Sequence, residues 1–216
     1  MADIFDEVEE DLRADRARRL AKRWGGVAFA VALLALGVTG GLQGWRYYQS
    51  EQAGTAAATY MTLHAAAEAE GADLATAANG FAALSRESPT GYRTLARFRA
   101  AALKAETGDL PAAIALWEAV SGDAEADRLY RDLATLLAVG HALDGGDPAQ
   151  LAARIGPLTE SSNPWQAPAR EIAALVALRR GDMADARARL QALATDATVS
   201  PGLRERAQRV AAGLGG

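Results

Sequence analysis

The chain has 216 residues and a formal net charge of −4, and it contains no cysteine and only two histidines. These counts exclude disulfides, thiolate nucleophiles and cysteine-rich metal sites. The acidic balance argues against a general nucleic-acid binder, because no surplus of Lys and Arg is available to neutralise phosphates. Alanine supplies 53 residues and aromatic residues only 6%. This composition predicts an all-α fold with closely approaching helices.

The first 23 residues form a charged tail with an acidic half followed by a basic half. Ile4, Val8 and Leu12 recur every four residues, which predicts a short amphipathic helix. The sequence supports two interpretations of this tail equally well. It docks on a cytoplasmic partner or on lipid headgroups, or it is a solvated helix whose charges only set the membrane topology.

An uncharged segment of 22 residues, WGGVAFAVALLALGVTGGLQGW, follows the tail. At about 1.5 Å per residue, a helix of this length crosses a hydrocarbon core of about 30 Å. Residues that favour the headgroup region stand at both ends. The sequence therefore predicts a single transmembrane helix over residues 24–46, with the interfacial anchors Trp24, Trp45, Arg46, Tyr47 and Tyr48.

Basic residues are unevenly distributed around this segment: six precede it, and Arg46 alone follows it before Arg86. The excess places the N-terminus in the cytoplasm, and residues 47–216 are expected in the periplasm of a two-membrane bacterium, anchored to its inner membrane. The main alternative is a signal peptide cleaved near Gly40. It is disfavoured because a leading segment with seven acids is unlike the short basic region of such signals.

The apolar segment contains two small-xxx-small pairs, Gly37 with Gly41 and Gly40 with Gly44. Glycines at this spacing let a neighbouring helix approach closely, so these four residues are helix-packing candidates. Coincidence is the favoured interpretation of this spacing, because the chain is rich in alanine and glycine throughout.

Four turns with glycine recur beyond the segment, with steps of 37, 38 and 35 residues between successive glycines. A period near 34 with a turn in mid-repeat is typical of tetratricopeptide repeats, in which pairs of helices stack into a solenoid. An irregular helical bundle is the alternative. The predicted turn residues are Gly71, Gly108, Asp109, Gly146, Gly181 and Asp182.

Proline and glycine positions then predict about four helical hairpins and a capping helix. The expected pairs are 50–70 with 74–87, 92–107 with 110–120, 124–143 with 149–158, and 164–180 with 183–194, followed by a cap over 201–212.

The chain resembles the ancillary SecYEG translocon subunit family, which consists of single-pass inner-membrane proteins with a periplasmic tetratricopeptide-like domain. The likeness rests on Lys22-Arg23-Trp24-Gly25, on Gly44-Trp45-Arg46-Tyr47-Tyr48 and on the Gly-Asp turns at Gly108 and Gly181. The resemblance implies association with the protein-export channel and with periplasmic chaperones, and assistance to secreted proteins as they emerge. The expected partners are therefore translocon subunits, chaperones, secreted clients and membrane lipid.

Motifs for phosphate cradling, serine activation or a catalytic metal do not occur, so the sequence predicts a non-enzymatic protein without a cofactor, a nucleic-acid partner or a small-molecule substrate. His64 and His141 stand on different predicted helices among alanines and leucines, and packed or surface histidines are favoured over ligands.

Partner-binding candidates are the cluster of Arg86, Tyr92, Arg93 and Arg97, and Trp165 at a helix start. Solvated surface charge is the favoured interpretation of the arginines, and the alternative is that they grip an acidic or C-terminal carboxylate group of a partner. A wedge into the neighbouring helix is the favoured interpretation of Trp165, and an interface anchor is the alternative. The leading hypothesis is a membrane-tethered protein-binding module of the export machinery. The second is an assembly scaffold for another envelope complex, such as division or respiratory machinery.

Overall fold

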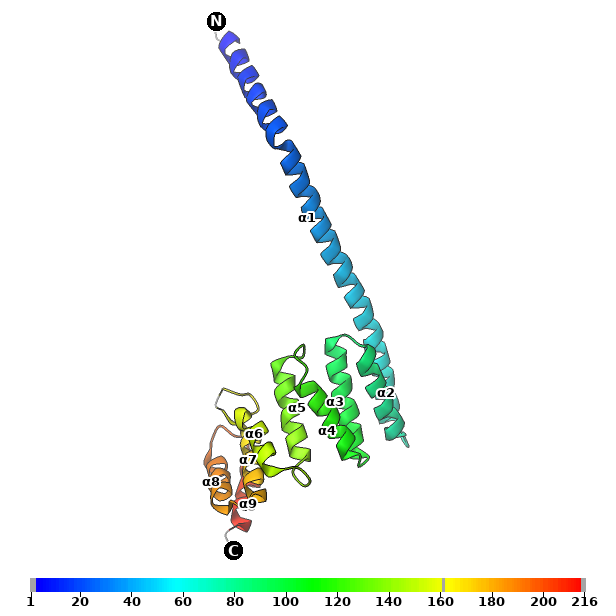
Figure 1. Cartoon of the computed structure of the whole chain (residues 1–216), viewed down its shortest axis with the longest axis vertical. Coiled ribbons are helices and arrows are strands. Elements are labelled where there is room, and N and C mark those ends of the chain that lie inside the picture. Colours follow the sequence, from blue (N-terminus) through cyan, green and yellow to red (C-terminus); the bar gives the residue numbers. More distant parts are fainter. Residues whose placement is uncertain (1–2, 161, 215–216) are drawn as a thin grey trace. The chain divides into compact units, whose positions relative to one another are not determined.

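The computed structural model describes residues 3–160 and 162–214, with side chains in the N-terminal helix at residues 22, 26, 29–31 and from 33 onward. Every regular element in these ranges is helical, which confirms the all-α fold (Figure 1). The elements are α1 (Asp3–Glu68), α2 (Leu74–Glu87), α3 (Thr90–Glu106), α4 (Leu110–Ser121), α5 (Arg128–His141), α6 (Pro148–Ile155), the 3₁₀ helix η1 (Gly156–Thr159), α7 (Gln166–Arg179), α8 (Met183–Thr195) and α9 (Pro201–Gly213).

The chain divides into two compact units, residues 1–52 and 53–216. Helix α1 contributes to both, and its residues 53–68 form the first helix of the second unit. The sequence predicts the tail, the apolar segment and residues 50–70 as separate segments, whereas the structure has one continuous helix from Asp3 to Glu68. The reason is that no proline interrupts the chain before Pro89 and alanine favours helix throughout.

In the first unit, two hydroxyl groups of α1 bond to backbone carbonyl groups of the same helix. The hydroxyl of Thr39 donates to the carbonyl of Ala35 over 2.7 Å, and that of Ser50 to the carbonyl of Tyr47 over 2.7 Å. The rings of Trp45 and Tyr48 lie 6.5 Å apart. Within the described residues, no helix carries a stretch that is both long and apolar enough to cross a bilayer.

Several sequence predictions fall on this unit and stay predictions. The side chains of the charged tail, apart from Lys22, and the anchor Trp24 lie outside the described residues. A Cβ placed on Gly37, Gly40, Gly41 or Gly44 would have no described neighbour within 4 Å, so the structure gives these glycines no packing partner there.

The second unit is a series of helix pairs in which each helix packs against the next along the chain (Figure 1). Residues 53–68 of α1 pair with α2, α3 with α4, α5 with α6 and α7 with α8, and α9 packs on both α8 and α7. This order is that of a tetratricopeptide-like solenoid. We call the first helix of each pair helix A and the second helix B.

Apart from the start of α1, which begins at Asp3 rather than at residue 50, the helix limits agree with the sequence predictions to within a few residues except in the third pair. Helix α5 begins at Arg128 rather than at residue 124, because the carboxylate of Asp127 caps it by accepting from the amide of Leu129 over 2.8 Å. Helix α6 ends at Ile155 and continues as the 3₁₀ turn η1, since Pro157 has no amide hydrogen to donate to the α-helical ladder.

The turn inside each pair has a common chemical basis. Gly71, Gly108 and Gly181 have φ between 74° and 85°, a left-handed conformation that favours glycine. Gly146 instead allows a close approach, because an added Cβ would lie 2.8 Å from the carbonyl oxygen of Ala142. An aspartate then caps every helix B: the residues are Asp73, Asp109, Asp147 and Asp182.

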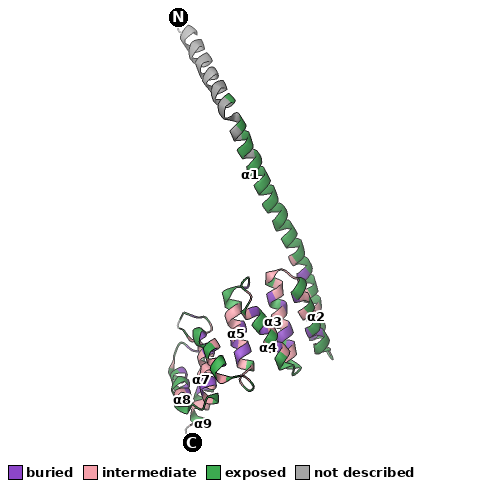
Figure 2. Ribbon diagram, viewed as in Figure 1, coloured by how far each residue is buried: buried purple, intermediate pink, exposed green. Residues whose placement is uncertain are grey.

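Buried residues lie where the helices face one another (Figure 2). Many of them are alanines with no exposed surface, among them Ala100, Ala113, Ala138 and Ala186. Large residues such as Phe81 and Leu190 fill the space between these contacts. Small side chains let the helix axes approach closely, which explains the alanine content of this unit.

Candidate functional site

A groove of about 720 Å³ opens along the A helices α1, α3 and α5 of the second unit. It is mainly apolar and aromatic. Its lining residues are Tyr60 of α1, Leu95, Phe98, Arg99, Ala102, Ala105 and Glu106 of α3, Trp117 of α4, and Tyr130, Leu133, Leu137 and His141 of α5. We call this site the A-helix groove.

Helical spacing explains why these side chains line one surface. The α3 residues recur three or four positions apart from Leu95 to Glu106, and the α5 residues do the same from Tyr130 to His141. Residues at this spacing share one face of a helix. Trp117 is only 2% exposed, whereas Leu95 and Tyr130 are 39% and 40% exposed, so Trp117 forms the bottom of the groove and the other two its accessible surface.

Aromatic rings contact one another across the helices. Phe98 of α3 lies 6.1 Å from Tyr130 of α5 between ring centroids. The imidazole of His141 stacks on Trp117 at 4.6 Å with an interplanar angle of 22°. The indole Nε1 of Trp117 is buried and has no hydrogen-bond acceptor among the described residues. The groove thus presents aromatic faces and edges, which suit apolar and aromatic side chains.

The groove contains few charged groups. A nitrogen of Arg99 donates to the carboxylate of Glu68, so the charge of Arg99 is compensated. Glu106, exposed at the end of α3, forms no ion pair with any residue that the structure describes. The formal charge left in the lining is therefore negative.

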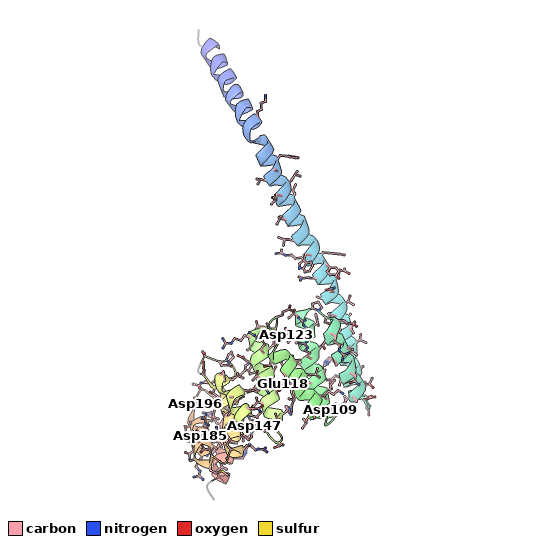
Figure 3. The ribbon with its side chains drawn as sticks, in the orientation of Figure 1. Asp109, Glu118, Asp123, Asp147, Asp185 and Asp196 are labelled. Carbon is pink, nitrogen blue, oxygen red and sulfur yellow. The ribbon has the colours of Figure 1, made fainter. Side chains whose placement is uncertain are left out.

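The predicted arginine cluster does not line the groove. Arg93 and Arg97 instead face the turn after α4, where Arg97 donates to Asp123 over 2.9 Å and Arg93 pairs with both Asp123 and Glu125 (Figure 3 labels Asp123). Two guanidinium groups are thus neutralised within the chain. A role for the cluster in gripping a partner's carboxylate, including Arg86 on the exposed surface of α2, stays a prediction.

These contacts lower the pKa values of the Asp123 and Glu125 carboxyl groups. Burial raises the pKa of Asp123, but the amide of Glu125 and the guanidinium groups of Arg93 and Arg97 lower it more, so the net shift is downward. The hydrogen bond from Arg93, followed by that from Thr90, lowers the pKa of Glu125. The cluster therefore joins α3 to the turn after α4 as an ionised network.

The other predicted binding residues pack against neighbouring helices. Trp165 donates from Nε1 to the carbonyl of Leu129 over 3.0 Å, and its amide bonds to Asn163 Oδ1 over 2.8 Å. Its ring joins the core between the third and fourth pairs. Tyr92 lies 6.2 Å from Tyr60 between ring centroids. These contacts give Trp165 the wedge geometry, and partner binding by Trp165 or Tyr92 stays a prediction.

The two histidines have separate surroundings. Nδ1 of His64 lies 4.0 Å from a carboxylate oxygen of Glu68, and His141 stacks on Trp117. In the described ranges, no group of three or more His, Asp or Glu side chains could hold a metal ion.

The sequence does not predict the groove residues as a binding site, and His141, one of them, is predicted only as a packed or surface histidine, although one signal for the groove is present. Leu95 and Leu133 both stand 13 residues before a turn glycine, Gly108 and Gly146 respectively. Equivalent positions on successive A helices line one surface in a stack of repeats.

A family model described as tetratricopeptide repeat-like domain matches residues 18–208. No curated protein and no solved structure matches the chain. Domains of this kind are typically non-catalytic modules that bind other proteins. Because the match covers most of its length, the chain belongs to the tetratricopeptide repeat-like domain family.

Proposed function

We propose that this protein is a membrane-anchored module that binds apolar segments of other proteins in the A-helix groove. The observation that carries the proposal is the aromatic lining shared by three successive A helices. Exposed apolar surface of this kind gains about 25 cal/mol for each Å² that a ligand covers.

The size of the groove fits a short peptide segment. Its lining on α3 runs from Leu95 to Glu106, which spans roughly 16 Å at about 1.5 Å per residue. An extended chain covers that length with about five residues. A groove this short binds a peptide with modest affinity. An anchor that holds the groove close to the proteins it binds raises their effective concentration, which compensates for the modest affinity.

We infer that residues 24–46 supply the anchor as a transmembrane helix, with the N-terminus in the cytoplasm and residues 47–216 in the periplasm. Large apolar side chains of this segment, including Phe29, Leu34 and Leu36, are 66–70% exposed in the structure, and a bilayer would cover them. The hydroxyl of Thr39 donates to the carbonyl of Ala35 in its own helix, so it needs no water as a partner in a bilayer. The family match also begins at residue 18, before this segment.

The finer proposal is that the anchor holds the groove at the exit of the protein-export translocon, where secreted proteins and periplasmic chaperones meet. Its support is the resemblance at Gly44-Trp45-Arg46-Tyr47-Tyr48 and the apolar groove, which suits segments that have not yet folded. The alternative is an assembly scaffold for another inner-membrane or envelope complex, which would use the same fold with different partners.

Membrane topology is tested by thiol labelling, for which the chain is well suited because it contains no cysteine. We expect a membrane-impermeant maleimide to label Ala83→Cys, on the exposed surface of α2, in intact spheroplasts. Ala14→Cys in the tail should react only after permeabilisation. The opposite pattern, or labelling of neither residue until the cells are opened, contradicts the proposed location.

Partner identity is tested by photocrosslinking in cells from a reactive residue at Leu95, in the groove. The matched control is Leu110, which is 40% exposed against 39% for Leu95 and does not line the groove. We expect secreted clients to crosslink from position 95 and not from position 110, and translocon subunits to crosslink from position 47. Recovery of other envelope subunits without translocon subunits favours the scaffold.

A further inference from the structure

We propose that the A-helix groove selects apolar segments that carry flanking Lys or Arg residues. This inference rests on the proposed function, since it names the chemistry of the segment that the groove binds. It has three separate supports: the charge of the lining, the charge of the helices around it, and the aromatic surfaces within it.

The lining itself favours a cation over an anion. Glu106 is exposed and forms no ion pair with a described residue, while the Arg99 guanidinium is held by Glu68. A segment with a basic residue near Glu106 gains a charge pair, and one with an acidic residue there meets repulsion.

The net charge of the repeats that form the groove also favours a cationic ligand. Residues 53–163 contain 14 acidic residues against eight Lys and Arg. Six of the eight basic side chains are already in ion pairs with acids of the same region: they are Arg93, Arg97, Arg99, Lys104, Arg128 and Arg154. The repeats that form the groove therefore carry an uncompensated negative charge, which attracts cationic segments over several ångströms.

The negative charge is a local property of the groove-bearing repeats. Residues 164–216, which include α7 to α9, contain eight arginines against five acids and are net positive. A basic segment is thus directed to the first three helix pairs and away from the last pair and the cap.

Aromatic rings add a second attraction for the same class of ligand. Tyr60, Phe98 and Tyr130 present ring surface to the groove. Lys and Arg side chains bind aromatic faces through cation–π contacts, and their aliphatic stems pack on apolar surface. The occupant that fits is a stretch of about five residues whose apolar side chains fill the groove and whose neighbours are basic.

The test compares three fluorescent peptides that share one Leu/Phe core and differ only in flanks of Lys, Ser or Glu. Their binding to the full chain in a non-ionic detergent is measured by fluorescence anisotropy. We expect the order Lys, Ser, Glu, with about a tenfold difference between the extremes at about 50 mM salt and convergence at about 500 mM. Equal affinities, or tighter binding of the Glu-flanked peptide, overturn the inference.

Matched variants assign the effects to the groove. Glu106→Gln should weaken the Lys-flanked peptide about threefold and leave the Ser-flanked one unchanged. Leu95→Gln should weaken all three peptides alike, and the exposed control Leu110→Gln should weaken none. A Lys preference that Glu106→Gln leaves intact contradicts the assignment. If no peptide binds, or if Leu95→Gln and Leu110→Gln behave alike, the proposed function itself fails.

Discussion

Arg97 donates from Nη1 to Oδ2 of Asp123 over 2.9 Å, which joins helix α3 to the turn after α4. Arg170 and Asp196 repeat this contact at the same distance between α7 and the end of α8. In both cases the arginine stands 11 residues before the turn glycine and the aspartate 15 residues after it. The second and fourth pairs therefore share an arginine–aspartate clasp that holds helix A to the end of helix B (Figure 3 labels both aspartates).

Removing the clasp should destabilise the repeat unit. Arg97 and Asp123 are 22% and 14% exposed, and Arg97 also donates to the carbonyl of Ala119. We expect Arg97→Gln to lower the free energy of unfolding by about 1–2 kcal/mol, measured by urea denaturation. Arg128→Gln is the control, because Arg128 is 79% exposed and lies 3.6 Å from Asp132, so its removal should change stability by about 0.5 kcal/mol or less. Equal effects of the two variants contradict the importance of the clasp.

Stability should also fall in acid. The hydroxyl of Thr198, the amide of Thr198 and Arg170 lower the pKa of Asp196 to about 2. The unfolded chain binds a proton at a higher pH than the folded chain does, so this contribution is complete above the unfolded pKa and is lost as the pH falls towards 2. The same direction holds for Asp73, whose pKa the hydroxyl and amide of Thr76 lower.

Thermal melts followed by circular dichroism check this dependence. The melting temperature should decrease between about pH 5 and about pH 3, and Asp196→Asn should decrease less over that interval because it lacks the titrating group. A wild-type melting temperature that rises on acidification, or a variant with the same slope as the wild type, contradicts the assignment.

The turn glycines give a separate prediction. Gly108 has φ of 85°, and a Cβ added there would meet nothing within 4 Å, so the cost of a side chain is conformational strain alone. We expect Gly108→Ala to lower the free energy of unfolding by about 1–2 kcal/mol. Gly122 also follows α4 but has φ of −87°, and its added Cβ would lie 3.5 Å from the Glu118 carbonyl. Gly122→Ala should therefore be neutral or slightly stabilising. If both variants lose a similar amount of stability, the left-handed conformation of Gly108 is not the cause of that loss.

Helix limits could be predicted from the sequence because each repeat marks its turn chemically. A glycine ends helix A and an aspartate caps helix B, as at Gly108-Asp109 and Gly181-Asp182. In the third pair two helix limits differ from the prediction. Asp127 caps the start of α5, and Pro157 ends the α-helical part of α6. These signals depend on neighbouring residues, so they can be read along the chain.

The candidate site could not be predicted in the same way, since it depends on which helix faces converge. Tyr60, Phe98 and Tyr130 come from three helices, and each alone has the appearance of an ordinary core residue. The partners of the arginines were hidden for a similar reason: Arg97 and Asp123 are 26 residues apart. The predicted arginine cluster thus forms ion pairs within the chain, and the apolar A-helix groove is the candidate binding surface instead.

The last prediction concerns the alanines at buried contacts between helices. Ala113 of α4 has no exposed surface and packs in a cluster with Ala101, Ala134 and Ala138, and the equivalent Ala186 of α8 is also fully buried. A larger side chain at these positions forces neighbouring helices apart, so Ala113→Leu should lower the free energy of unfolding by about 1–3 kcal/mol. Ala115→Leu, at an exposed position of the same helix, should have almost no effect because leucine is also a good helix former. Urea denaturation of the two variants measures the difference. A variant at Ala113 as stable as the one at Ala115 would show that the helices are not held at the close distance that the alanines permit.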